Sequence, residues 1–139
     1  MGVVRNGIAV LAASAAVAVA GQTGAAASVQ YSSDAFGPLC VDSCLSRASG
    51  GIVWGARTAT VSGSVSLYNS PGYTTLFVDA FAGSTKVASQ TRTTSGGKIS
   101  FKFVMTYARP GGINRIRTQI CNTYHGQRVC SGQENDIRN

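Results

Sequence analysis

TATVSGSVSL, residues 58–67, is the stretch that decides the fold, because apolar residues or glycine alternate in it with Ser and Thr. Strict alternation is typical of a half-buried β-strand, in which successive side chains point to opposite faces of a sheet. The face predicted to turn inward carries Ala59, Val61, Gly63, Val65 and Leu67. No helical periodicity of useful length follows, so the predicted fold is all-β.

Two turns extend this reading toward the C-terminus. Gly83-Ser84 suits a two-residue hairpin, which pairs Ala80 with Val87. A three-residue loop at 95–97 with a bulge then pairs Val87 with Met105 in a second hairpin. Both turns agree on one inner face, formed by Leu76, Val78, Ala80, Val87, Ile99, Phe101, Phe103 and Met105.

The four cysteines predict two disulfides. His125-Gly126 lies midway between Cys121 and Cys130, and a two-residue turn there places these cysteines opposite each other. Their Cα atoms are then about 4.5 Å apart, within disulfide reach. Sequence alone permits three connectivities, and pairing Cys40 with Cys44 follows by elimination. The cysteine spacings do not match paired zinc motifs, so we expect no metal and no cofactor.

The chain divides into three expected segments. Residues 1–27 are typical of a secretory signal peptide, in which Arg5 precedes an apolar run and an Ala-Ala-Ala site ends at residue 27. Residues 28–51 are expected to be irregular, with room for one short helix at 38–47, and residues 52–139 to form a β-sandwich. No other apolar run approaches the roughly 20 residues of a membrane span. We therefore expect a secreted, extracellular protein without a transmembrane anchor.

Several features resemble one class of exported proteins. The Ala-rich leader, the runs RTATVSGSVSLYN (57–69) and GGKISFKF (96–103), and the late cysteine hairpin resemble small secreted immunoglobulin-like β-sandwich proteins of high-GC Gram-positive bacteria. The resemblance covers most of residues 52–139 and implies an immunoglobulin-like antiparallel β-sandwich with disulfides. Many proteins of this class have no known activity, so the resemblance implies no functional residue.

The charge balance and the scarcity of catalytic groups favour a binding protein over an enzyme. The formal net charge is +7, which favours anionic surfaces, although it can also serve solubility alone. The single histidine, His125, lies in a tight turn. The last hairpin is expected to pair Arg115 with Asp136 and Arg117 with Glu134, which leaves these acids a structural role.

The candidate ligand site is an outward face with two aromatic side chains around a carboxylate. It comprises Phe77, Asp79, Phe81, Gln90, Arg92 and Lys102. The alternative is that residues 28–51 fold over the aromatics and bury them. The expected partner is an extracellular protein or an anionic or glycan cell-surface polymer, and nucleic acid is not expected as a specific ligand. Two alternatives remain: an enzyme inhibitor that presents residues 69–73 or the 121–130 hairpin, and a small hydrolase that uses Asp79.

Overall fold

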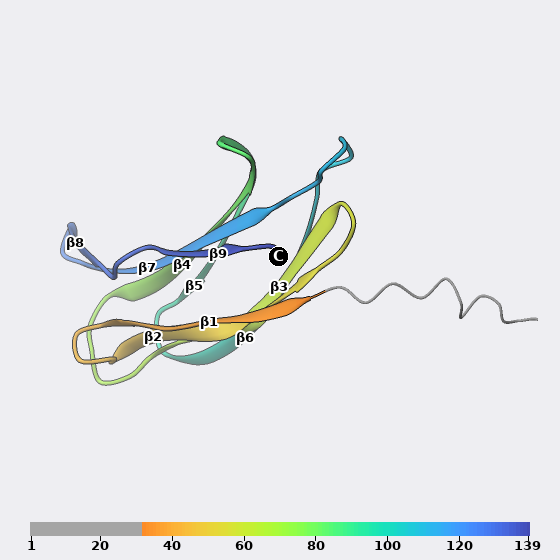
Figure 1. The fold of residues 1–139 in the computed structure, drawn as a ribbon. Helices are drawn as coiled ribbons and strands as arrows, with labels where there is room; N and C mark the ends of the chain where they lie inside the picture. Colours follow the sequence, from red (N-terminus) through yellow and green to blue (C-terminus); the bar gives the residue numbers. More distant parts are fainter. Residues whose placement is uncertain (1–31) are drawn as a thin grey trace, which may run out of the picture. The chain divides into compact units, whose positions relative to one another are not determined.

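The protein is built from two antiparallel β-sheets, as a computed structural model describes it for residues 32–139 (Figure 1). One sheet has the strand order β1-β2-β3-β6, and the other has the order β5-β4-β7-β8, with β9 also pairing with β7. The signal peptide expected at 1–27 lies outside the described residues. The strands are β1 Ser33–Val41, β2 Ser46–Trp54, β3 Thr58–Leu67, β4 Tyr73–Ala82, β5 Thr85–Thr94, β6 Gly97–Thr106, β7 Arg115–Tyr124, β8 Gln127–Cys130 and β9 Glu134–Ile137.

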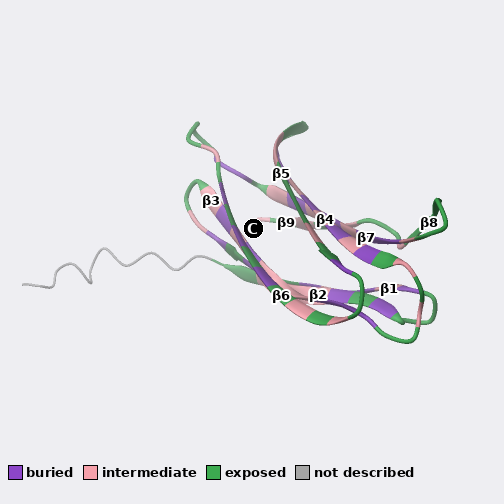
Figure 2. Ribbon diagram, turned by 180° about the vertical axis from the view of Figure 1, so that it is seen from behind, coloured by how far each residue is buried: buried purple, intermediate pink, exposed green. Residues whose placement is uncertain are grey.

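The core lies between the two sheets, where the sequence alternation placed it. Along most of β4 and the first half of β3 the buried positions alternate with less buried ones, and Figure 2 shows the degrees of burial in purple, pink and green. Seven of the inner positions expected from the sequence on these strands are buried, namely Ala59, Val61, Val65, Leu67, Leu76, Val78 and Ala80. The all-β prediction with a two-sheet core is therefore confirmed.

A row of four residues crosses the inner face of the first sheet. Phe36 on β1 pairs with Gly50 on β2, which pairs with Gly63 on β3, which pairs with Phe101 on β6. The two phenyl rings approach to 6.3 Å between centroids, although two strands separate them. A Cβ at Gly63 would overlap the carbonyl oxygen of Ser49. The two glycines therefore provide the space that the rings and the close backbones occupy.

The prediction for residues 28–51 was wrong where the structure describes them. Instead of an irregular segment with a short helix at 38–47, β1 and β2 form an antiparallel pair. Their register shifts between Phe36 and Leu39, and this irregularity breaks the period of two that identifies a strand. The turn between the strands has positive φ from Asp42 to Cys44, which is incompatible with a helix.

The expected hairpin between residues 85–94 and 97–106 was also wrong. β5 pairs with β4, whereas β6 pairs with β3 in the other sheet, so the loop between them crosses from one sheet to the other. Phe101, Phe103 and Met105 still face the core and are buried. A hairpin and a sheet-crossing loop bury the same face of a strand, so the alternation could not distinguish them.

A bulge in β5 changes which side chains this strand turns inward. The predicted two-residue turn is present, with Ala82 opposite Thr85, but the register then shifts and Ala80 pairs with Ala88 rather than Val87. A shift of one residue moves every following side chain to the other face. Gln90 and Arg92 therefore lie in register with the inward-facing positions of β4, against expectation.

Both predicted disulfides are present. Cys121 pairs in register with Cys130, with Cα atoms 4.0 Å apart, across a turn in which His125 and Gly126 both have positive φ. Cys40 and Cys44 are bridged across the turn between β1 and β2, and no cysteine is free in the part of the chain that the structure describes.

Gly63→Ala is expected to destabilise the fold by about 3 kcal/mol, because its methyl group would overlap backbone that packing holds in place. Gly96→Ala is the matched control, since a Cβ there meets nothing within 4 Å, and its effect should stay within about 0.5 kcal/mol. Urea unfolding of the two variants checks this. Equal stability of both variants would show that the glycine row does not constrain the sheet.

Candidate functional site

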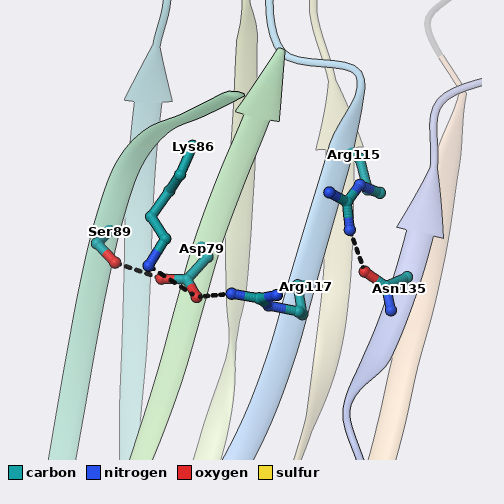
Figure 3. Close-up of polar contacts among 6 residues, drawn as sticks. All are labelled: Asp79, Lys86, Ser89, Arg115, Arg117 and Asn135. Atoms are coloured by element: carbon teal, nitrogen blue, oxygen red, sulfur yellow. Dashed lines mark hydrogen bonds and ion pairs between the residues drawn. The ribbon is translucent and has the colours of Figure 1, made fainter. Parts of the chain in front are cut away.

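The outer face of the second sheet brings together three of the six residues expected to form a site. Phe77 and Asp79 alternate with the buried residues of β4 and face outward, and Phe81 lies on the same side, beneath Arg115 and Arg117. The neighbouring strand β7 places Arg117 opposite Asp79 and Arg115 opposite Phe81. We call this surface the arginine face, and Figure 3 shows its central polar contacts. It comprises Phe77, Asp79, Phe81, Lys86, Ser89, Arg115, Arg117, Arg128 and Asn135.

Asp79 is the central carboxylate of this face. Arg117 Nη2 donates to Asp79 Oδ2 at 3.0 Å, Lys86 Nζ lies 3.6 Å from the same oxygen, and Ser89 donates to Oδ1 (Figure 3). Partial burial acts to raise the pKa of Asp79, but the hydrogen bonds from Ser89 and Arg117 and the charges of Lys86 and Arg117 outweigh it and lower the pKa. Asp79 is therefore ionised at neutral pH and holds Arg117 in place.

The two aromatic side chains are covered by guanidinium groups. Arg115 and Arg117 place their Cζ atoms 3.9 Å and 4.9 Å from the centroid of the Phe81 ring, and Phe81 is only 6% exposed. Arg128 on β8 lies 4.9 Å above the Phe77 ring. Cations over an aromatic face are attracted by the quadrupole of the ring. The rings therefore support arginines rather than offering bare stacking surfaces.

The other three expected site residues lie elsewhere. The Cζ atom of Arg92 lies 5.3 Å from the centroid of the core ring of Phe103, and Gln90 shares its inward register on the edge strand β5. Lys102 pairs with Ser62 in the first sheet, on the opposite side of the molecule from Asp79. The bulge in β5 and the sheet-crossing loop explain these differences, so the six-residue platform is not assembled.

The sequence predicted that Arg115 and Arg117 would form ion pairs with Asp136 and Glu134, but the structure pairs them differently. β9 pairs with β7 one residue out of the predicted register, so Arg117 lies opposite Asn135 rather than Glu134. Arg115 Nη1 donates to the neutral amide oxygen of Asn135 at 2.6 Å, and Arg117 pairs with Asp79 (Figure 3). Arg115 and Arg117, two residues apart on one strand, were the sequence signal for this face. The signal was discounted because both arginines were expected to be neutralised by ion pairs.

The same shift turns two acids inward, toward the edge between β1 and β9. Glu134 Oε1 accepts a hydrogen bond from the Gly37 amide at 2.7 Å, and Asp34 Oδ2 accepts one from the Trp54 indole at 2.6 Å. Burial, and then the charges of Glu134 and Asp34, raise the pKa of Asp136 to about 6. Asp136 therefore lies close enough to Glu134 and Asp34 to be repelled by both.

Neither the acidic side chains nor His125 forms a metal-binding group within residues 32–139. No three His, Cys, Asp or Glu side chains of this range are grouped to hold a metal ion. His125 is exposed in its turn, and its ring packs against Tyr124 at a tilt of 58°, with ring centroids 4.1 Å apart. Among residues 32–139, no helix has the length and apolar character that crossing a membrane requires.

Asp136→Asn is expected to stabilise the protein at neutral pH and to remove a pH dependence. Because the pKa is raised in the folded state, the contribution of Asp136 is greatest below the unfolded value of 3.8 and is lost as the pH rises through about 6. Asp79 acts in the opposite sense, since its lowered pKa gives stability that is lost only as the pH falls below 3.8.

Urea unfolding at about pH 4.5 and about pH 7.5 measures this effect, which should be about 1 kcal/mol because solvent reduces both the burial penalty of the charge and the repulsion. The variant should lose less stability than the wild type between the two conditions. Asp42→Asn, which removes an exposed carboxylate from the β1–β2 turn, should behave as the wild type. The same pH dependence in Asp136→Asn as in the wild type would contradict the prediction.

No protein-family model matches the chain, and comparison with curated proteins and with solved structures gives no match.

Proposed function

We propose that the protein is a non-catalytic secreted binding domain whose arginine face attaches to an anionic polymer of a cell surface. The observation that carries this proposal is that three guanidinium groups lie over two phenyl rings on one sheet face. Only one carboxylate, Asp79, forms ion pairs on this face. The face therefore carries an excess of positive charge in fixed positions.

The cations of the face are held, but not all are neutralised. Arg117 and Lys86 share Asp79, whereas Arg115 and Arg128 form no ion pair in the part of the chain that the structure describes. A guanidinium that rests on a ring keeps N–H groups free at its edge, and these suit the paired oxygens of a carboxylate, phosphate or sulfate. Repeated anionic groups along a polymer can therefore contact several arginines at once.

The extracellular setting is part of the proposal. Two disulfides are typical of proteins that fold in an oxidising compartment, and the leader predicted at 1–27 supports export. An immunoglobulin-like relationship is supported by the two antiparallel sheets around one core. The order β1-β2-β3-β6 differs from the constant-type immunoglobulin sheet, in which the second strand neighbours the fifth.

Arg115→Gln is expected to weaken binding to heparin, a sulfated polymer, by about three- to ten-fold and to lower the slope of log affinity against log salt by about one charge. Lys102→Gln is the matched control, because it removes a cation from the opposite sheet. Asp79→Asn should strengthen binding, because it frees the charges of Lys86 and Arg117 while keeping an oxygen for Arg117.

Titration of labelled heparin at several salt concentrations measures these effects by fluorescence anisotropy. If Arg115→Gln and Lys102→Gln lose equal heparin affinity, binding depends only on the net charge of the protein, and a specific role for this face is contradicted. Unchanged binding in Asp79→Asn would contradict the view that Asp79 partly neutralises it.

A second candidate function is inhibition of an extracellular enzyme by the loops at one end of the sandwich. The β1–β2 turn, the β3–β4 loop and the β7–β8 hairpin meet at this end, on the left in Figure 1. Three tyrosines are exposed there, namely Tyr68 at 51%, Tyr73 at 44% and Tyr124 at 45%. Both disulfides lie beside these loops, so exposed tyrosines sit on a rigid base, an arrangement suited to protein recognition.

Assays against a panel of extracellular proteases and glycosidases test the inhibitor function. Stoichiometric inhibition that Tyr124→Ser weakens by about ten-fold or more, while Arg115→Gln leaves it unchanged, would support it. An absence of inhibition across the panel, or inhibition that Arg115→Gln abolishes, would count against it.

A further inference from the structure

A pocket of about 420 Å³ lies on the outer face of the first sheet, on the opposite side from the arginine face. Its volume falls within the roughly 300–1,000 Å³ of small-molecule sites. The residues that line it and carry polar groups are Arg47, Ser49, Ser64, Ser66, Tyr68 and Lys98.

The strand register arranges these groups in two rows. Arg47 on β2 pairs with Ser66 on β3, which pairs with Lys98 on β6, so two cations flank a hydroxyl. The next row places Ser49 beside Ser64. The backbones of β2 and β6 are two interstrand spacings apart, about 9.6 Å. Two long cationic side chains at that separation can reach one anionic group between them.

Small side chains form the floor of this pocket, and an aromatic ring forms one wall. Tyr68 follows β3 directly, and its backbone amide donates to the Leu45 carbonyl at 3.0 Å. Leu45 belongs to the turn that the Cys40–Cys44 disulfide closes, so the wall rests on a cross-linked loop. Tyr68 is 51% exposed, which leaves its ring accessible to a ligand.

The charge of the pocket is uncompensated. No carboxylate lines it, and neither Arg47 nor Lys98 forms an ion pair with any other residue in the described range 32–139. Two unpaired cations over hydroxyl groups suit an oxyanion, because charge-assisted hydrogen bonds are the stronger ones. Hydroxyls and an exposed tyrosine ring suit the hydroxyl groups and the apolar face of a sugar.

We propose that this pocket binds an anionic saccharide. Its carboxylate or phosphate lies between Arg47 and Lys98, its hydroxyls contact Ser49 and Ser64, and its ring lies against Tyr68. The pocket shares no residue with the arginine face, so this second site exists whether or not that face binds a polymer.

Isothermal titration with D-glucuronate and with D-glucose 6-phosphate tests the proposal and separates a carboxylate ligand from a phosphate one. At least one should bind with a dissociation constant in the millimolar range or tighter, and D-glucose should bind at least ten-fold more weakly. Arg47→Gln and Lys98→Gln should each weaken binding about ten-fold. Both side chains are exposed, and unfolding curves confirm that the variants are folded.

Lys102→Gln is the matched control, because it removes a cation from the same face of the same strand, and its affinity should stay within about two-fold of the wild type. Arg115→Gln should also bind as the wild type. The proposal is overturned if neither anionic sugar binds, or if Lys102→Gln weakens binding as much as Lys98→Gln. It is equally overturned if inorganic phosphate binds as tightly as glucose 6-phosphate, because the sugar then contributes nothing.

Discussion

The row Phe36–Gly50–Gly63–Phe101 is the packing constraint on which the first sheet depends. Side chains at the two central positions would collide with backbone, and their absence lets rings from the two outer strands meet at 6.3 Å above the sheet centre. The Phe101 ring stacks in turn on Phe103 at 5.1 Å, and the guanidinium of Arg92 covers Phe103 from the edge strand of the other sheet. A continuous line of aromatic contacts thus runs from β1 to the open edge between β6 and β5, and two small residues make it possible.

This inner row also determines what the outer face displays. Because side chains alternate along a strand, fixing Gly50 and Gly63 inward fixes Ser49 and Ser64 outward, followed by the row of Arg47, Ser66 and Lys98. A slip of one residue between β2 and β3 would place a serine in the core and a valine in the pocket floor. The register that buries the rings is thus the register that places two cations and several hydroxyls side by side.

The sequence predicted individual strands better than their partners. Alternation identified the inner faces of β3, β4 and β6, and the turn at His125-Gly126 gave the Cys121–Cys130 pair, because both signals are local. Most errors came from one-residue irregularities. The amino-acid pattern does not predict the bulges in β1 and β5 or the shifted register of β9. Each of them moves the following side chains of its strand to the opposite face of the sheet. The prediction of the candidate site was affected most, because its six residues lie on three different strands. Phe77, Asp79 and Phe81 share one strand and stayed together, whereas Gln90, Arg92 and Lys102 did not.

These irregularities also separate the charges of the protein. The shifted β9 takes Glu134 and Asp136 to the inner edge beside Asp34, where three carboxylates are partly withdrawn from solvent. Had β9 paired as the sequence predicted, both acids would have faced Arg115 and Arg117 and would have offset most of the positive charge of the arginine face. Burial, and then repulsion from Glu134 and Asp34, raise the pKa of Asp136 at this edge. The gain is a surface on which Asp79 is left as the one carboxylate among several arginines. The separation of acids from arginines therefore leaves Arg115 and Arg128 without ion pairs among residues 32–139, which is the arrangement that the proposed binding function uses.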